Sequence, residues 1–102
     1  MEIVWSRPAR ARLVEIRAYV ARDKPDEAAR LATRIVAVVE ALRNHPNLGR
    51  AGAEAGIREL VIGGTPYVVL YSVKKSHITI STIWHGAQSR KKTGRSGRKA
   101  KG

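Results

Sequence analysis

The chain contains no cysteine, which excludes two kinds of site. A disulfide framework and a thiolate metal site both require cysteine side chains. The three histidines, His45, His77 and His85, are scattered along the chain, and their spacing matches no metal-binding motif. We therefore expect a protein that holds neither a metal ion nor another cofactor.

Long apolar runs are also absent. Arg, Glu or Gly interrupts the apolar stretches well before the roughly 18 residues that a membrane span requires. The N-terminal "MEIVWSRPAR" lacks the charged and apolar regions of a signal peptide. We expect a cytoplasmic protein that does not bind membranes, and a length of 102 residues suits a single domain.

Aromatic and acidic residues are scarce. The chain has no Phe, so the aromatic platform on which many RNA-binding modules stack bases is missing. Eight acids against 20 Lys and Arg leave a net charge of +12, of which residues 89–102 carry +7 and residues 1–88 carry +5. A positive field attracts an acidic protein as well as a phosphate backbone, so charge does not choose between these partners.

The first half of the chain predicts a short strand and two helices. "EIVW" is a strand candidate, and Ser6 and Pro8 then mark a helix start. Two segments with apolar residues at helical spacing follow, about three residues apart, which predicts an antiparallel helical hairpin. The two apolar stripes, which we expect in the core, are Ala9, Leu13, Ile16 and Val20, and then Ala28, Leu31, Ile35, Val38 and Leu42.

The second half predicts strands. After the Gly- and Ala-rich loop "NLGRAGAEAG", strand candidates span residues 57–63, 67–73 and 77–84, joined by linkers of hairpin length. The order β-α-α-β-β-β predicts an α+β fold, with a two-helix hairpin on one face of a mainly antiparallel sheet of about four strands. We assign residues 1–88 to this domain and expect residues 89–102 to form a disordered basic tail.

His85 is the first candidate functional residue. Strict alternation in "HITISTIWH" places Ile78, Ile80, Thr82 and Trp84 on one face, so Trp84 is predicted to anchor the core. His85 would then lie on the face away from the helices, beside the basic tail. It could act there as a general acid or base or bind a phosphate, or it could be a solvated histidine at a strand end.

Arg58 is the second candidate. In "GIREL", alternation places its guanidinium on the same face as Leu60 and Ile62. An arginine in such a place could be a bidentate ligand for phosphate or carboxylate. The alternative is a structural arginine paired with a nearby acid such as Glu59 or Glu54.

Other motifs predict structure more than chemistry. Tyr67 and Tyr71 share a face of one predicted strand, where they could stack on a base or pack in the core. "GGTP" lacks the lysine and the strand-to-helix context of a phosphate loop and is typical of a turn. The sequence contains no recognisable Ser-His-Asp arrangement, carboxylate pair or cysteine nucleophile.

Five segments in order nevertheless resemble one family. "VWSRPARARLVEIRAYVARDKPDEAARLATRI", "LRNHPNLGR", "GIRELVIGG", "YVVLYSV" and "IWHGAQSR" resemble the RelE/ParE superfamily of bacterial toxins over residues 3–90. The superfamily fold, a helical hairpin on an antiparallel sheet, agrees with the fold predicted above.

This resemblance implies a toxin that a cognate antitoxin neutralises by wrapping its extended C-terminal segment around the toxin, in a heterodimer or heterotetramer. RelE-like members are endoribonucleases that cut mRNA on the ribosome, whereas ParE-like members poison DNA gyrase. Operator DNA would be bound only through the antitoxin. A third hypothesis, from another class, is a plain nucleic-acid-binding module that binds through residues 89–102.

The resemblance also suggests site residues. Arg58 and His85 match family positions, but the family's "WHGAR" reads "WHGAQ" here, with Gln88 in place of arginine, and no tyrosine follows. These departures favour the ParE-like branch. The candidate catalytic residues of a nuclease are Arg58, His85 and Arg90; the candidate target contacts are Tyr71, Gln88, Lys91 and Lys92; and the candidate antitoxin contacts are Leu13, Arg17, Arg30 and Arg34.

Overall fold

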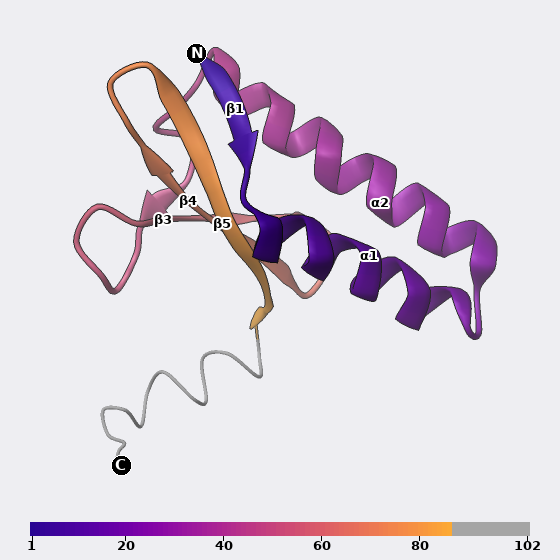
Figure 1. Ribbon diagram of the computed structural model, residues 1–102. Helices are drawn as coiled ribbons and strands as arrows, with labels where there is room; N and C mark the ends of the chain where they lie inside the picture. Colours follow the sequence, from indigo (N-terminus) through magenta and orange to yellow (C-terminus); the bar gives the residue numbers. More distant parts are fainter. Residues whose placement is uncertain (87–102) are drawn as a thin grey trace.

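The computed structural model describes residues 1–86, so the predictions for Gln88, Arg90, Lys91, Lys92 and the basic tail lie outside the described residues. Two helices and five strands follow one another in this part of the chain (Figure 1). The elements are β1 (Glu2–Trp5), α1 (Arg7–Ala21), α2 (Pro25–Glu40), the 3-10 turn η1 (Ala41–Arg43), β2 (Arg50–Ala51), β3 (Arg58–Val61), β4 (Tyr67–Val73) and β5 (His77–His85).

The strands form one sheet in the order β1-β5-β4-β3-β2. β1 runs parallel to β5, and the other neighbours are antiparallel. The predicted α+β fold is therefore confirmed, with one strand more than the expected four. The extra strand is β2, whose two residues lie in the predicted loop and pair with β3. A two-residue strand has no alternation that a sequence pattern could reveal.

The helical hairpin forms as the local signals predict. The Ser6 side chain caps α1 by accepting a hydrogen bond of 3.1 Å from the Ala9 amide. The same hydroxyl lies 3.0 Å from the Ser81 carbonyl oxygen, to which it donates, so the start of α1 is tied to β5. Residues 22–24 connect the helices, in agreement with the predicted short linker.

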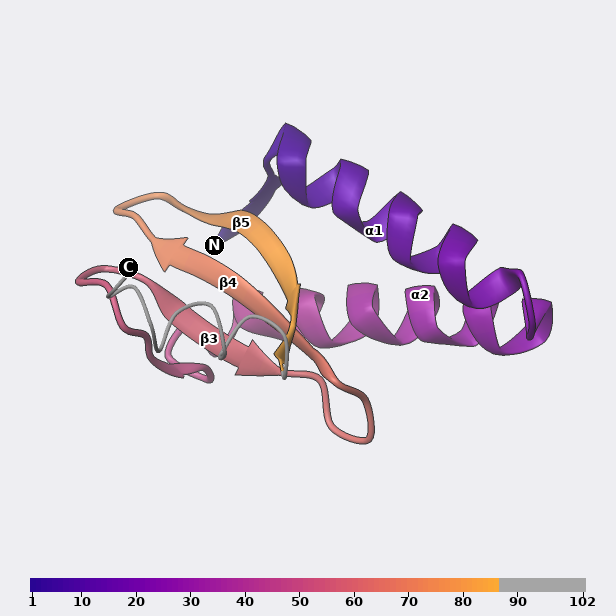
Figure 2. The same ribbon diagram turned by 90° about the horizontal axis from the view of Figure 1, so that it is seen from below.

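The core lies between the hairpin and one face of the sheet. Figure 1 and Figure 2 show α1 beside β5, and in both views the far end of the hairpin extends beyond the strands. Every residue of the two predicted stripes is buried or half-buried. The buried members of the core cluster are Ala9, Ile16, Ile35, Val39, Leu42, Leu60, Ile62, Tyr67, Val69, Tyr71, Ile78, Ile80 and Ile83.

A bulge in β5 overturns the predicted orientation of its last residues. Tyr71 pairs with Ile80 and Leu70 with Thr82, so Ser81 is an extra residue in the ladder. Beyond it the alternation shifts by one position. The prediction that Trp84 anchors the helix-side core is therefore wrong.

The consequences follow from the new register. Ile83 pairs with the core residue Val69 and is fully buried, whereas Trp84 pairs with Val68 and is half-buried on the other face. His85 pairs with Tyr67 and faces the helices, not away from them as strict alternation predicts. In the described chain, no helix is long and apolar enough to cross a membrane.

Candidate functional site

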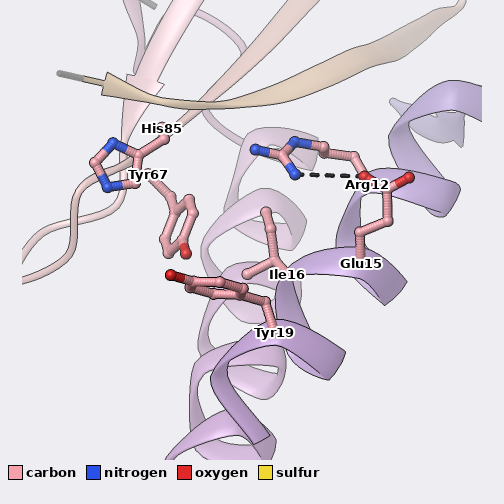
Figure 3. Close-up of a pocket in the computed structure, with 6 residues that line it drawn as sticks. All are labelled: Arg12, Glu15, Ile16, Tyr19, Tyr67 and His85. Atoms are coloured by element: carbon pink, nitrogen blue, oxygen red, sulfur yellow. Dashed lines mark hydrogen bonds and ion pairs between the residues drawn. The ribbon is translucent and has the colours of Figure 1, made fainter. Parts of the chain in front are cut away.

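A pocket of about 440 Å³ opens where the hairpin extends past the sheet. Its walls come from α1, from the first residue of β4 and from the last residue of β5 (Figure 3). The lining residues are Arg12, Glu15, Ile16, Tyr19, Tyr67 and His85. His85 lines the pocket because the bulge in β5 turns its side chain toward the helices, opposite to the predicted direction.

Helical and strand periodicity place these side chains together. Residues three or four positions apart share one face of α1, which aligns Arg12, Ile16 and Tyr19 along the pocket. The directly opposed pair Tyr67 and His85 forms the facing wall. Their rings meet edge to face, with a centroid separation of 5.6 Å and an interplanar angle of 82°.

Arg12 connects the two walls. Its Nε donates a hydrogen bond of 3.0 Å to the Ile83 carbonyl, which fixes the guanidinium against β5. One terminal nitrogen lies 3.4 Å from a Glu15 carboxylate oxygen, and this carboxylate side chain is 65% exposed. The exposed pair contributes little energy, so the carbonyl contact is the one that positions Arg12.

His85 contributes the side of its ring to the pocket. In Figure 3 both ring nitrogens are directed away from Arg12 and the two tyrosines. Its Nδ1 is buried and has no hydrogen-bond partner among residues 1–86. Among those same residues, no group of three or more His, Cys, Asp or Glu could hold a metal ion.

Arg58 lies at a different place and has a structural partner. It faces the helix side, as predicted, but its terminal nitrogen donates a hydrogen bond to the Gly49 carbonyl oxygen at 2.6 Å. The acid expected beside it, Glu59, instead pairs with Arg50 at 3.2 Å. Arg58 therefore holds the chain segment that leads into β2.

Tyr71 holds the same segment. Its ring is fully buried, and its hydroxyl accepts a hydrogen bond of 2.8 Å from the Gly49 amide while donating one of 2.8 Å to the Pro46 carbonyl. The structure thus places Tyr71 in the core, where its ring has no surface for a target. The packing alternative is the one observed.

The fold does not bring Arg58 and His85 together. Arg58 is the neighbour of Tyr71 and His85 is the neighbour of Tyr67, on opposite sides of β4. Four residues along a strand span ~13 Å, and the two strand spacings add about 10 Å across the sheet. Arg58 lines a separate pocket of about 350 Å³ that Glu54 and Val73 also line.

Three of the four candidate antitoxin contacts lie at the surface. Arg17 on α1 and Arg30 and Arg34 on α2 are exposed, whereas Leu13 is half-buried against the core. A terminal nitrogen of Arg34 lies 3.5 Å from where a Cβ atom on Gly63 would be, so this side chain reaches the β3–β4 turn. The hairpin therefore presents exposed arginines from both helices.

Sequence reasoning missed Arg12, Glu15 and Tyr19. Their spacing of three and four residues, beside the apolar stripe, indicated a shared face of α1. Only the packing of α1 on the end of β5 reveals that this face meets Tyr67.

Comparison with known proteins identifies the family. Residues 3–90 match the family described as "ParE toxin of type II toxin-antitoxin system, parDE". The chain belongs to the ParE toxin family. Membership makes it a toxin of the type II toxin–antitoxin class, and an antitoxin is the partner protein of that class.

Similar proteins agree with this assignment. The ParE-family chain is 41% identical over 86 residues to Y4kP of Sinorhizobium fredii, a candidate toxin by its name, and the match covers 84% of this chain and 88% of that protein. It is 37% identical over 87 residues to the toxin RelE2 of Caulobacter vibrioides, covering 85% and 97%. A solved structure of a chromosomal ParDE system from P. aeruginosa contains a chain with a TM-score of 0.77 and 27% identity, covering 83% and 95%.

Proposed function

We propose that this ParE-family toxin inhibits DNA gyrase and does not cut RNA. The observation that carries the proposal is the separation of Arg58 and His85 across the sheet. An RNA-cleaving site needs its acid–base group and its charge-stabilising group within hydrogen-bond reach of one phosphate. Two groups that lie on opposite sides of β4, four residues apart along it, do not meet this condition.

The local contacts of both residues support the same conclusion. Arg58 is held by the Gly49 carbonyl, and the ring nitrogens of His85 point away from the pocket that it lines. The family match and the "WHGAQ" departure at Gln88 also favour the ParE-like branch. Gyrase inhibition requires a binding surface and no nuclease cluster.

We further propose that the antitoxin binds on the helical hairpin. Arg17, Arg30 and Arg34 are exposed there, and the apolar Val14 and Tyr19 are exposed on the same hairpin, at 67% and 68%. An extended segment with acidic and apolar side chains would complement this surface.

Gyrase assays test the target directly. Purified toxin should inhibit supercoiling and accumulate DNA-cleavage complexes, and addition of the cognate antitoxin should reverse both effects. Unchanged supercoiling in the presence of a folded toxin that binds its antitoxin would contradict the gyrase proposal.

The second candidate is a ribosome-dependent mRNA endoribonuclease, which the similarity to RelE2 favours. Cuts in mRNA that require the ribosome and disappear in Arg58→Ala or His85→Ala would support it. Because Arg58 holds a backbone carbonyl, Arg58→Lys and a denaturation curve for each variant are the controls.

A further inference from the structure

We propose that the pocket between α1 and the ends of β4 and β5 is a carboxylate subsite that takes one Asp or Glu side chain of the antitoxin. The inference rests on the proposed binding of the antitoxin to the hairpin. The pocket residues are not among the candidate antitoxin contacts predicted from the sequence, which are Leu13, Arg17, Arg30 and Arg34. The inference gives these pocket residues a class of ligand.

The first observation concerns Tyr67. Its side chain is largely buried, at 7% exposure, yet its hydroxyl has no hydrogen bond within the part of the chain that the structure describes. Tyr71, on the same face of β4, uses its hydroxyl twice. Among residues 1–86, the fully buried side-chain nitrogen or oxygen without a partner is Nδ1 of His85, so the hydroxyl of Tyr67 reaches the open space of the pocket, where it can donate a hydrogen bond to a ligand.

The second observation is the convergence of donors. In Figure 3 the hydroxyl groups of Tyr19 and Tyr67 point into the same space between α1 and the sheet. The guanidinium of Arg12 lies at the same pocket and is already held by the Ile83 carbonyl. A guanidinium has five N–H donors, and its Nε and the contact with Glu15 occupy two, so three remain for a ligand.

The donors select a carboxylate. Two phenols and a guanidinium donate hydrogen bonds, and a carboxylate accepts them with two oxygens in a plane. One guanidinium that shares its charge with Glu15 suits a monoanion better than a doubly charged phosphate. The apolar wall of Ile16 and the two tyrosine rings can pack on the methylene groups of an Asp or Glu side chain.

The position of the pocket indicates that the carboxylate belongs to a peptide side chain. The pocket adjoins the exposed helical hairpin. Its wall residue Tyr19, which is 68% exposed, also belongs to the surface proposed for the antitoxin. A space of about 440 Å³ accommodates a side chain but no folded element. Arg12 is fixed before binding, so little side-chain entropy remains to be lost.

The main experiment uses the full-length toxin, separated from its cognate antitoxin and refolded. Its affinity is measured for the antitoxin and for variants in which each Asp or Glu becomes Asn or Gln, one at a time. Tyr67→Phe should weaken binding of the unmodified antitoxin by about tenfold, the size of one hydrogen bond to a charged group. One antitoxin substitution should cost more than this with the wild-type toxin, because it also weakens the contacts with Tyr19 and Arg12, and it should cost less with Tyr67→Phe than with the wild type.

A second experiment tests whether the pocket binds a carboxylate at all, independently of the antitoxin. Sodium acetate is titrated while ring resonances of Tyr67 are followed by NMR. The shifts should saturate in the wild type, and Arg12→Gln should abolish saturation. Arg10→Gln, which removes the same charge from an exposed position of α1, should behave as the wild type.

Tyr71→Phe is the matched control for Tyr67→Phe. Both changes remove one hydroxyl from a buried tyrosine of β4. Tyr67→Phe should leave the denaturation midpoint unchanged, because its hydroxyl has no partner among the described residues, and Tyr71→Phe should lower the midpoint but leave the acetate titration intact.

The outcomes are distinct. Tight antitoxin binding that is unaffected by Tyr67→Phe overturns the inference while the proposed antitoxin surface stands. Failure of the wild-type toxin to bind its antitoxin overturns the proposed function and, with it, the peptide source. Saturable acetate binding without coupling to any antitoxin residue assigns the site to a free carboxylate, and absence of both effects removes the site altogether.

Discussion

Two tyrosines on one strand show how differently the same residue type is used at the scale of single residues. Tyr71 bridges two backbone groups of the segment before β2, whereas Tyr67 lines a pocket. Both lie on the helix-side face of β4, and the sequence predicts that they share a face. Alternation therefore determined that the two side chains lie on the same face, but the neighbouring segments determined their roles.

The cost of losing the Tyr71 hydroxyl should be measurable. Tyr71→Phe leaves the buried Gly49 amide without its acceptor, and an unsatisfied buried group costs about 1–3 kcal/mol. We expect a lower free energy of unfolding by that amount in urea titration. A curve that superposes on the wild type would show that water replaces the hydroxyl.

The capping serine is a second residue with a specific role. Ser6→Ala removes the cap of α1 and the hydrogen bond to the Ser81 carbonyl. Loss of a serine cap lowers the free energy of unfolding by about 1 kcal/mol, and loss of the hydrogen bond to Ser81 should lower it further. The control is Ser76→Ala, a change in the exposed β4–β5 turn that should leave the urea midpoint nearly unchanged.

At the scale of the elements, β5 decides the geometry of the pocket. The extra residue Ser81 turns Ile83 and His85 toward the helices, and Thr82 and Trp84 toward the other face. Without this shift, the wall opposite α1 would lack His85, and the candidate histidine would face away from the hairpin.

Substitutions in β5 test this shift. Ile83→Ala should lower the free energy of unfolding by about 2–5 kcal/mol, because the side chain is fully buried in the core. Thr82→Ala, the matched change on the other face, should cost much less. A larger loss of stability for Thr82→Ala than for Ile83→Ala would indicate strict alternation along β5 and contradict the bulge.

At the scale of the whole molecule, charge and toxicity should be separable. Residues 89–102 carry +7 and lie outside the described structure, whereas the hairpin and the pocket lie in residues 1–86. Truncation at Arg90 should weaken nonspecific DNA binding and flatten its salt dependence, since each phosphate contact adds nearly one unit to the slope.

The same truncation should leave toxicity and antitoxin binding mostly intact. Growth assays and affinity measurements on the truncated chain check this expectation. A truncated toxin that folds and binds its antitoxin but no longer arrests growth would place the target-binding site in the residues that follow "WHGAQ".

Expression of the chain alone in bacteria should arrest growth, and co-expression of the cognate antitoxin should relieve the arrest, as expected for a member of the ParE toxin family. Colony counts after induction, with and without the antitoxin, measure both effects. Harmless accumulation of folded, soluble protein in the native host would argue against a toxin.

Local sequence signals were enough to predict most of the elements and the family. Helical spacing, the Ser6 cap and the short linkers are local properties, so they predicted both helices, their core stripes and four of the strands. Motifs in chain order predicted the RelE/ParE superfamily, which the family match confirms. The two-residue strand β2 was not predicted, because it is defined only by its pairing with β3.

Tertiary structure decided the rest. A bulge depends on how β4 and β5 twist against each other, so the alternation of "HITISTIWH" could not reveal that Trp84 and His85 exchange faces. The partners of Arg58 and Tyr71 lie 9 to 25 residues away along the chain. The pocket likewise joins Arg12 to Tyr67 and His85, which only the packing of α1 on the sheet brings together, because contacts between distant segments leave no periodic signal in the sequence.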